Sequence, residues 1–225
     1  MIQRQWATID PIFDISDPHL ACNNPGAPPP SAIPLRAGDT ITAVYWYWLH
    51  PVGPMTVWMA RCVDTNTEGE EVEVDCGKVD VSRVGWFKIW EGGLLEGPNL
   101  AEGLWYQKEF QRWDGSPGLW PVRIPAGLKS GRYMIRHEIL SIHVEWKPQF
   151  YPECAHLNIT GGGELVVPEE VLVRFPGIYK EDGECLPGTT MTWGGLGKSV
   201  LTGPDPSIFL DIYSKENANR TVSES

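Results

Sequence analysis

The chain has 225 residues, enough for one domain with a substantial buried core. Hydrophobic residues make up 42%, and no stretch approaches the roughly 20 apolar residues that span a bilayer, so the composition excludes both a disordered chain and a membrane-helix protein. The net charge of −11 argues against nucleic-acid binding, which needs clustered Lys and Arg. An uncharged or weakly charged ligand is the expected partner.

The predicted elements are mostly short strands separated by long loops. Residues 23–34 are Pro-rich and predict a surface loop. The strongest strand is predicted over 40–48, where β-branched and aromatic residues dominate. Residues 121–124 and 131–144 are expected to pair across the turn at 125–128. Further strands are predicted over 55–60, 86–90, 154–160 and 208–213.

One segment favours a helix. Residues 99–113 carry Asn99 and Glu102 at the spacing of a capping box, although Gly103 weakens the pattern. Many strands and little helix indicate an all-β fold, an antiparallel β-sandwich of the immunoglobulin or fibronectin-III type with long loops. No repeat divides the chain, so residues 1–225 are expected to form a single domain.

The cysteines and sequons favour an exported protein. Five Cys allow at most two intramolecular disulfides, and Asn158 and Asn219 each begin a glycosylation sequon. Against this, the residues after Met1 contain no apolar leader, so we expect either a cytosolic protein or a start that this sequence lacks. The acidic run 68–75 is expected to be a solvated loop.

Two groups of side chains attract attention as a possible metal- or oxygen-handling site. His143, Gln149 and Tyr151 can converge if the chain turns back at 147–148, and His50 follows the aromatic strand in a turn stiffened by Pro and Gly. The simpler alternative is a surface His143, a core Tyr151 and an ordinary turn histidine at position 50. His137 shares a strand with His143 but lies about 20 Å from it, too far to share a metal.

Other chemistries have less support. His19 and His156 have no comparable group of polar side chains near them in the sequence, and they are expected to face solvent. The sequence contains no G-x-S-x-G, phosphate-binding loop, H-E-x-x-H or C-x-x-C pattern. A pair of carboxylates for glycoside hydrolysis, drawn from residues such as Glu138 and Glu145, stays an open alternative.

The order of many short motifs resembles the lytic polysaccharide monooxygenases of auxiliary activity family nine, formerly glycoside hydrolase family sixty-one. The resemblance covers roughly residues 11–213. It rests on these segments: Asp17-Pro18-His19-Leu20-Ala21-Cys22-Asn23, Ala37-Gly38-Asp39, Gly53-Pro54 with Cys62, Trp86-Phe87-Lys88-Ile89, Ile124-Pro125, Gly131-Arg132-Tyr133, Arg136-His137-Glu138, His143, Gln149 to Cys154, Phe175 to Tyr179, and Asp205-Pro206-Ser207-Ile208 to Tyr213.

The resemblance implies a secreted, monomeric enzyme that uses one copper ion, O2 or H2O2 and an external electron donor to cleave cellulose or a related β-1,4-glucan. It assigns copper ligation to His50 with Tyr151 as the axial neighbour, and hydrogen bonding to the activated oxygen species to His143 and Gln149. It also implies sugar stacking by Tyr213 and a disulfide joining Cys22 to Cys154. The second disulfide is then expected to join Cys62 to Cys76, which leaves Cys185 unpaired.

The sequence departs from the family pattern at the N-terminus. The family binds copper through the amine and side chain of an N-terminal His plus a second His, a nitrogen set that suits copper. This sequence starts with Met1, and the usual His-x-Gly-Pro is one residue longer at His50. We therefore expect a core at 11–213 that lacks the family's first strand, and a tail at 214–225. The sequence as printed should bind Cu(II) poorly and be inactive.

Two other functions remain open from the sequence. The first is a non-catalytic polysaccharide-binding relative that has lost the copper site. The second is a generic extracellular sandwich module for adhesion.

Overall fold

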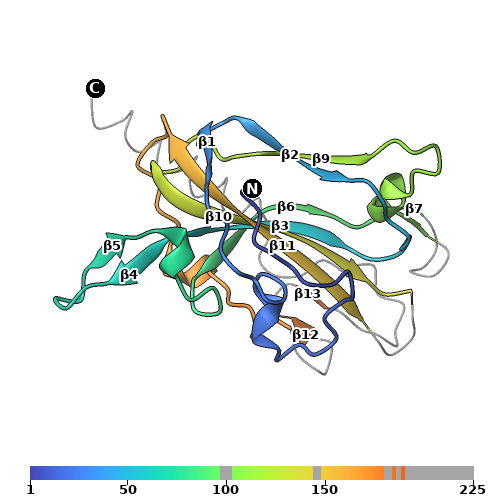
Figure 1. Cartoon of the computed structure of the whole chain (residues 1–225), viewed down its shortest axis with the longest axis horizontal. Coiled ribbons are helices and arrows are strands. Elements are labelled where there is room, and N and C mark those ends of the chain that lie inside the picture. The colour runs from blue at the N-terminus through green and yellow to red at the C-terminus, as the bar shows by residue number, and fades with distance from the viewer. Residues whose placement is uncertain (97–102, 144–147, 180–183, 186–188, 191–225) are drawn as a thin grey trace.

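The computed structural model describes residues 1–96, 103–143, 148–179, 184–185 and 189–190. Its elements are mostly short strands, with a few single turns of 3₁₀ helix (Figure 1). In chain order these are η1 (Pro18–Leu20), β1 (Ile33–Arg36), β2 (Thr40–Tyr45), β3 (Met55–Arg61), β4 (Val63–Thr65), β5 (Glu71–Glu73), η2 (Cys76–Lys78), β6 (Trp86–Gly92), β7 (Leu94–Glu96), β8 (Leu104–Trp105), η3 (Tyr106–Phe110), β9 (Gly118–Arg123), β10 (Gly131–Ser141), β11 (Gln149–Thr160), η4 (Glu169–Val171), β12 (Glu184–Cys185) and β13 (Thr189–Thr190).

The strands form the expected β-sandwich. A five-stranded sheet has the order β1-β11-β10-β3-β6, and β2 and β9 form a separate two-stranded sheet. The longest ladder of the five-stranded sheet joins β10 to β11 in antiparallel register, from Gly131 opposite Ile159 to Ser141 opposite Gln149. One pair departs from the antiparallel expectation, because β1 runs parallel to β11 at the edge. No helix in the described ranges has the length and apolar character needed to cross a membrane.

The large sheet is covered on both faces, which explains the continuous apolar run of β3. One set of β3 side chains, including Val57 and Met59, packs with Trp120 of β9 in one buried cluster. The alternate set, including Trp58, packs with Phe175 and the loop around Leu20 in another. A strand buried on both faces needs apolar residues at successive positions, because neighbouring side chains point to opposite sides.

The predicted pairing of 121–124 with 131–144 is wrong. β9 pairs with β2, where Thr40 lies opposite Arg123, whereas β10 pairs with β11 and β3. The turn after Ile124 therefore passes from one sheet to the other instead of closing a hairpin. The closeness of the two strands in the sequence does not show which strands they pair with, because each has an apolar face that either sheet can cover.

The predicted helix at 99–113 is also wrong over its described part. Residues 103–113 form the short strand β8 and the single turn η3, and Asn99 and Glu102 lie outside the described residues. Trp105 and Phe110 are drawn into the core, and so is Gln107, which hydrogen-bonds groups on other elements. These tertiary contacts override the local preference for helix.

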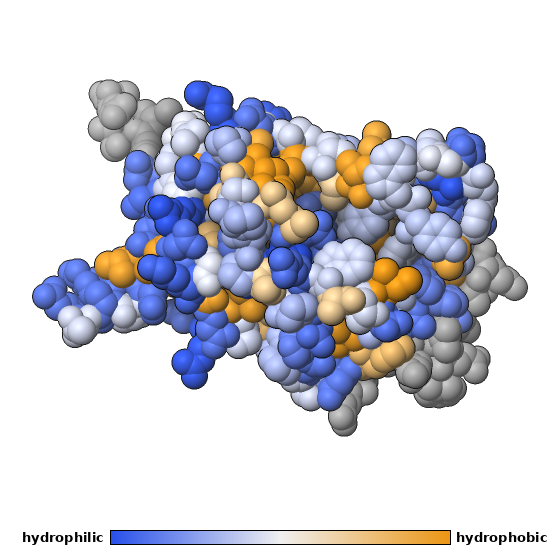
Figure 2. Space-filling view, in the orientation of Figure 1, coloured by the Kyte–Doolittle hydropathy of each residue, from blue (hydrophilic) through white to orange (hydrophobic). Residues whose placement is uncertain are grey.

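His156 does not face solvent as predicted. It is buried on β11, and its Nε2 accepts a hydrogen bond from Arg4 Nε at 3.1 Å. The acidic run, by contrast, forms the exposed outer part of the β4–β5 hairpin and the residues that follow it. This hairpin projects from the body on the left of Figure 1, where the surface in Figure 2 is mostly hydrophilic.

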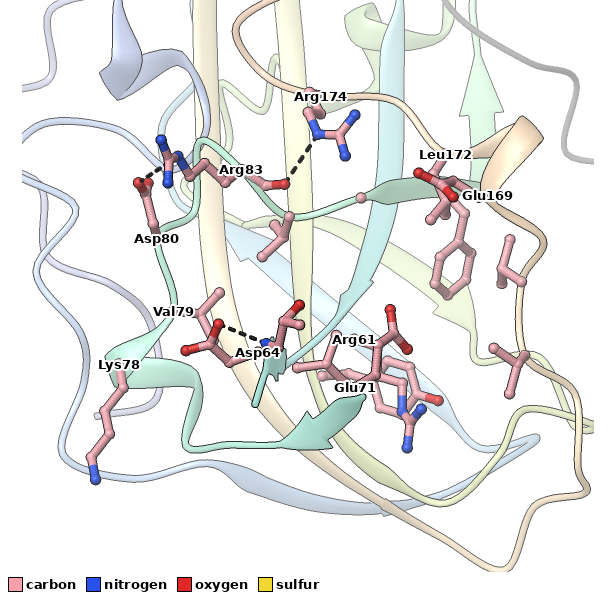
Figure 3. A pocket seen from close by; sticks show the side chains of 18 of the residues that line it. Arg61, Asp64, Glu71, Lys78, Val79, Asp80, Arg83, Glu169, Leu172 and Arg174 are labelled. Atoms are coloured by element: carbon pink, nitrogen blue, oxygen red, sulfur yellow. Dashed lines mark hydrogen bonds and ion pairs between the residues drawn. The ribbon is translucent and has the colours of Figure 1, made fainter. Parts of the chain in front are cut away.

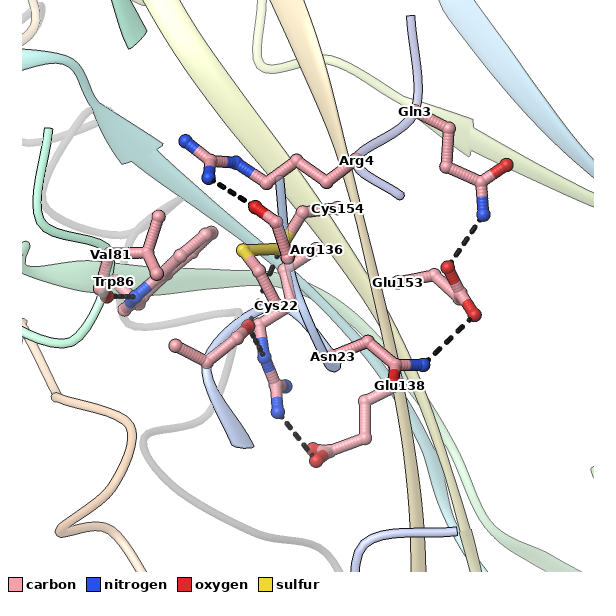
Figure 4. The surroundings of a disulfide bond; sticks show 12 residues. Gln3, Arg4, Cys22, Asn23, Val81, Trp86, Arg136, Glu138, Glu153 and Cys154 are labelled. Atoms are coloured by element: carbon pink, nitrogen blue, oxygen red, sulfur yellow. Dashed lines mark hydrogen bonds and ion pairs between the residues drawn. A yellow bond between two sulfur atoms is a disulfide. The ribbon is translucent and has the colours of Figure 1, made fainter. Parts of the chain in front are cut away.

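Among the described residues there are two disulfides, with the pairings that the resemblance implied. Cys62 is joined to Cys76, and Cys22 is joined to Cys154. The Cys22–Cys154 bond joins the N-terminal loop to β11 next to a buried ion pair, Arg136 with Glu138 (Figure 4). It therefore links two segments that are distant in sequence at the centre of the sheet.

The two disulfides should differ in their contribution to stability. The Cys22–Cys154 bond spans 132 residues and the Cys62–Cys76 bond spans 14. In the chain-entropy view the larger loop restricts the unfolded chain more, by about 5 against about 3 kcal/mol. We expect the double variant Cys22→Ala/Cys154→Ala to lose more free energy of unfolding than Cys62→Ala/Cys76→Ala in urea titrations. Equal losses would contradict the loop-length argument.

Stability should fall with acid because two buried histidines are neutral in the fold. Burial lowers the pKa of His137 to about 4, and burial followed by the nearby Arg4 lowers the pKa of His156 to about 4. The unfolded chain, with a histidine pKa near 6.5, takes up these protons first as the pH drops. The stabilisation present above about pH 6.5 is therefore lost between about 6.5 and 4.

The variant His156→Gln keeps an acceptor for Arg4 but has no proton to gain. Urea titrations at several pH values should show that it loses less stability than the wild type between pH 7 and 4.5. An unchanged pH dependence in this variant would contradict a neutral His156.

Candidate metal centre

The site lies where the loop after β2 meets the start of β11. Loop residue His50 places its Nε2 2.9 Å from the hydroxyl oxygen of Tyr151 on β11. The ring of His143, just beyond the end of β10, lies 4.6 Å from the ring of His50, centroid to centroid. Three predicted site residues from separate segments are therefore in contact.

The register of β10 and β11 positions the remaining groups. Tyr151 lies opposite Ile139, and Gln149 lies opposite Ser141 at the end of the ladder. The Tyr151 hydroxyl donates to Gln149 Oε1 at 3.0 Å, since both side chains stand on the same side of β11. Ser141 Oγ forms a hydrogen bond with His143 Nδ1. The four predicted residues therefore form one connected group.

Two side chains that the sequence reasoning missed hold the His50 loop. The indole of Trp48 makes edge contacts with the rings of His50 and Tyr151, and its Nε1 donates to Gln107 Oε1 at 3.1 Å. Gln107 Nε2 donates in turn to the carbonyls of Gly53 (2.9 Å) and Leu140 (3.1 Å). Trp48 could have been suspected from its position in the aromatic run, but no pattern marked Gln107.

Gly53 is required by the close approach of two backbones. Its φ is 135°, and a Cβ at this position would lie 1.9 Å from the carbonyl oxygen of Leu140. Only glycine allows the loop to run so close to β10. The Gly-Pro following His50 therefore serves to fix the loop that carries the imidazole.

Electrostatics keep the two candidate ligand groups neutral at neutral pH. Burial, and then the electrostatic effect of the neighbouring His143, lowers the pKa of His50. Burial, and then the carboxylate of Asp10, raises the pKa of Tyr151 to about 12. The His50 imidazole is thus available as a neutral nitrogen donor, whereas Tyr151 remains a protonated phenol, a weaker donor.

The residues present fit part of a copper ligand set. Donor atoms that ligate one metal ion at about 2 Å lie roughly 3 Å apart at adjacent positions, and His50 Nε2 and the Tyr151 oxygen are separated by 2.9 Å. Imidazole nitrogen is a ligand that suits copper. In the described ranges, however, no group of three His, Cys, Asp or Glu is arranged to hold a metal.

The other predicted positions lie elsewhere. His19 is partly exposed and hydrogen-bonds Asp17, and Asn158 is exposed on β11 as a glycosylation site requires. Tyr213 and Asn219 lie outside the described residues.

A second hollow lies on the side of the β4–β5 hairpin and contains none of the predicted site residues (Figure 3). Its lining is charged with both signs, and Arg83 pairs with Asp80 at its rim. Because its basic and acidic groups are mixed, the hollow favours neither an anionic nor a cationic ligand.

Comparison with known proteins identifies the family. The model of Auxiliary Activity family 9 (formerly GH61) matches residues 1–220. The chain belongs to Auxiliary Activity family 9. Membership in this family supports copper-dependent oxidative cleavage of polysaccharides in general.

Similar proteins agree with this assignment. The chain is 36% identical to AA9 family lytic polysaccharide monooxygenase B of Heterobasidion irregulare, across 98% of this chain and 78% of that protein. It is also 36% identical to the monooxygenase-like protein CEL1 of Agaricus bisporus, where 92% of this chain covers only 62% of that protein.

Solved structures of family 9 members share the fold. The structure of HiLPMO9B gives a TM-score of 0.73 at 35% identity over 90% of this chain and 85% of that one. A cellulose-active polysaccharide monooxygenase from M. thermophila gives 0.77 at 31% identity over 91% and 86%. The β-sandwich expected from the sequence is therefore confirmed.

Replacing Gln107 should destabilise the fold and loosen the site. The variant Gln107→Leu leaves the Trp48 N–H and the carbonyls of Gly53 and Leu140 without a partner, which should cost about 2–3 kcal/mol in the free energy of unfolding. Gln111→Leu is the matched control, because Gln111 also bonds this loop at Leu49 but from the surface. It should cost less than about 1 kcal/mol. Equal losses in urea titrations would show that Gln107 has no special role.

Proposed function

We propose that this protein is a secreted copper-dependent monooxygenase that cleaves β-1,4-glucan chains, chiefly cellulose, with O2 or H2O2 and an external electron donor. The observation that supports it is the contact of His50 with Tyr151, beside His143 and Gln149, in a chain of family 9. A structural neighbour of the same family is described as cellulose-active. The two disulfides and the exposed sequon at Asn158 are consistent with secretion.

In this proposal each residue has one task. His50 would ligate copper through Nε2, which requires its ring proton to sit on Nδ1. Tyr151 would be the second group beside the copper, with its hydroxyl oriented by Gln149 Oε1. Copper bound there would supply the one-electron chemistry that activates oxygen.

His143 and Gln149 would act on the oxygen species by hydrogen bonding. His143 is exposed, and its Nδ1 is engaged by Ser141, so its Nε2 is the nitrogen left to meet a ligand. Gln149 keeps its amide N–H2 available while its oxygen accepts from Tyr151. The pair therefore offers an imidazole nitrogen and an amide N–H2 as hydrogen-bonding groups.

The ligand set of the described residues favours a second candidate as well. One imidazole and a phenol hold copper weakly, and a protein made as residues 1–225 should bind Cu(II) poorly and leave cellulose unoxidised. A non-catalytic, polysaccharide-binding member of the family is therefore the alternative. The two candidates differ in the nitrogen ligands that accompany His50.

The 5′ end of the transcript and the products of the native protein distinguish them. If the enzyme is correct, an upstream leader is followed at once by His, and the native protein with copper and ascorbate releases oxidised cello-oligosaccharides detectable by mass spectrometry. The His50→Ala form should release none, and the His19→Ala control should match the wild type. Binding to cellulose without oxidised products, with another residue at the native start, would support the binding protein.

Copper binding can be measured separately from activity. Calorimetric titration of residues 1–225 with Cu(II) should show weak binding that is lost in His50→Ala and kept in His19→Ala. Tight binding by residues 1–225 that survives in His50→Ala would place the metal elsewhere and contradict the proposed site.

A further inference from the structure

Ser141 and His143 lie at the end of β10, beside the candidate metal centre. Ser141 is opposite Gln149 in the ladder, so its side chain is on the side of the sheet that carries Gln149 and Tyr151. The ring of His143 lies 4.6 Å from the ring of His50, centroid to centroid, with 33° between the ring planes. Ser141 therefore contacts the site through His143 without being a candidate metal ligand itself.

The side chain of Ser141 forms one hydrogen bond among the described residues. Its Oγ lies 2.5 Å from Nδ1 of His143, and the serine is fully buried, with 0% of its surface exposed. A serine hydroxyl has one proton to donate, and a buried donor without an acceptor costs free energy. Since Nδ1 is the one acceptor that this hydroxyl meets in the described ranges, the hydroxyl donates its proton to Nδ1.

This hydrogen bond determines which nitrogen of the neutral His143 ring carries the proton. Neutral imidazole has one N–H and one bare nitrogen, and the nitrogen that accepts a hydrogen bond is the bare one. With Nδ1 accepting from Ser141, the ring proton sits on Nε2. The opposite tautomer would direct Nδ1–H at the hydroxyl and leave the buried proton of Ser141 without an acceptor among the described residues.

The backbone between the two residues is fixed to the loop that carries His50. The N–H of Ile142 donates to the carbonyl of Val52 at 3.0 Å, and Val52 follows His50 by two residues. Backbone hydrogen bonding therefore sets the spacing between the strand end and the loop. The rotation of the His143 ring is the freedom that remains, and the hydroxyl of Ser141 restricts it.

We infer that Ser141 is a positioning residue whose hydroxyl holds the neutral His143 ring with Nδ1 bare and Nε2 protonated, so that the ring beside His50 offers an N–H. This N–H can donate to an electron-rich oxygen atom, whereas the other tautomer would offer a lone pair at Nε2. The identity of that atom as part of the activated oxygen species rests on the proposed function. The tautomer of His143 does not.

Nitrogen NMR of the copper-free chain of residues 1–225 tests the inference. Protonated and bare imidazole nitrogens differ in chemical shift, so the spectrum of protein labelled with heavy-nitrogen histidine reports the tautomer, and the variant His143→Gln identifies the signals of this ring. At the alkaline end of a pH series, where the ring signals no longer change, we expect a protonated Nε2 and a bare Nδ1 in the wild type.

Variants of Ser141 show whether its hydroxyl sets the tautomer. Ser141→Ala removes the hydroxyl and adds no volume, and the loss of one hydrogen bond should shift the ratio of the two tautomers about fivefold toward Nδ1–H. Ser141→Thr keeps a hydroxyl and should restore the wild-type ratio. The control Ser82→Ala removes a hydroxyl that is bonded to Asp80, and it should leave the signals of His143 unchanged.

The native protein loaded with copper gives a second readout. Ser141→Ala should oxidise cellulose about fivefold more slowly with H2O2 while it binds cellulose as the wild type does, and Ser141→Thr should recover the rate.

A proton on Nδ1 of His143 in the wild type, or an equal tautomer ratio in Ser141→Ala, would overturn the inference. A shifted ratio with an unchanged rate of oxidation would overturn its link to the oxygen species. A wild type that has the expected tautomer but oxidises no cellulose would instead contradict the proposed function, and the positioning role of Ser141 would be retained.

Discussion

The pairing of β10 with β11 is the interaction on which the rest of the structure depends. It extends over eleven opposed residue pairs, and both strands lie inside the five-stranded sheet. On one side of this ladder the side chains of Ile135 and Ile139 form the core beneath β2 and β9. At its open end it carries Ser141 and Gln149 to the surface. If the register of this pairing shifted by one residue, each of these side chains would move to the other face of the sheet.

The opposite side of the same ladder contains buried charge. Arg136 donates to Glu138 Oε1 at 2.6 Å and to the carbonyls of Leu20 and Ala21 at 2.8 and 2.9 Å, and its guanidinium lies over the ring of Phe175. Removing either charge would leave the other buried without its partner, which is strongly destabilising. The pair thus fixes the N-terminal loop against the sheet, in the same place as the Cys22–Cys154 disulfide.

The candidate metal centre lies at one end of a mostly apolar groove between β2 and the start of β11. His50 and Tyr151 line the end of the groove, and Trp48 contacts both rings. The groove is bounded by secondary structure, whereas the His50 loop depends on Gln107 and on the glycine at position 53.

The sequence by itself determined the β-sandwich class, most strands, the family and the candidate residues His50, His143, Gln149 and Tyr151, because strand periodicity and motif order are local properties. Tertiary structure alone decided that β9 pairs with β2, that residues 103–113 are not helical and that His156 is buried. It also revealed the role of Gln107 in holding the His50 loop. These features depend on which elements meet across the fold, and contacts between residues far apart in the chain leave no local pattern to read.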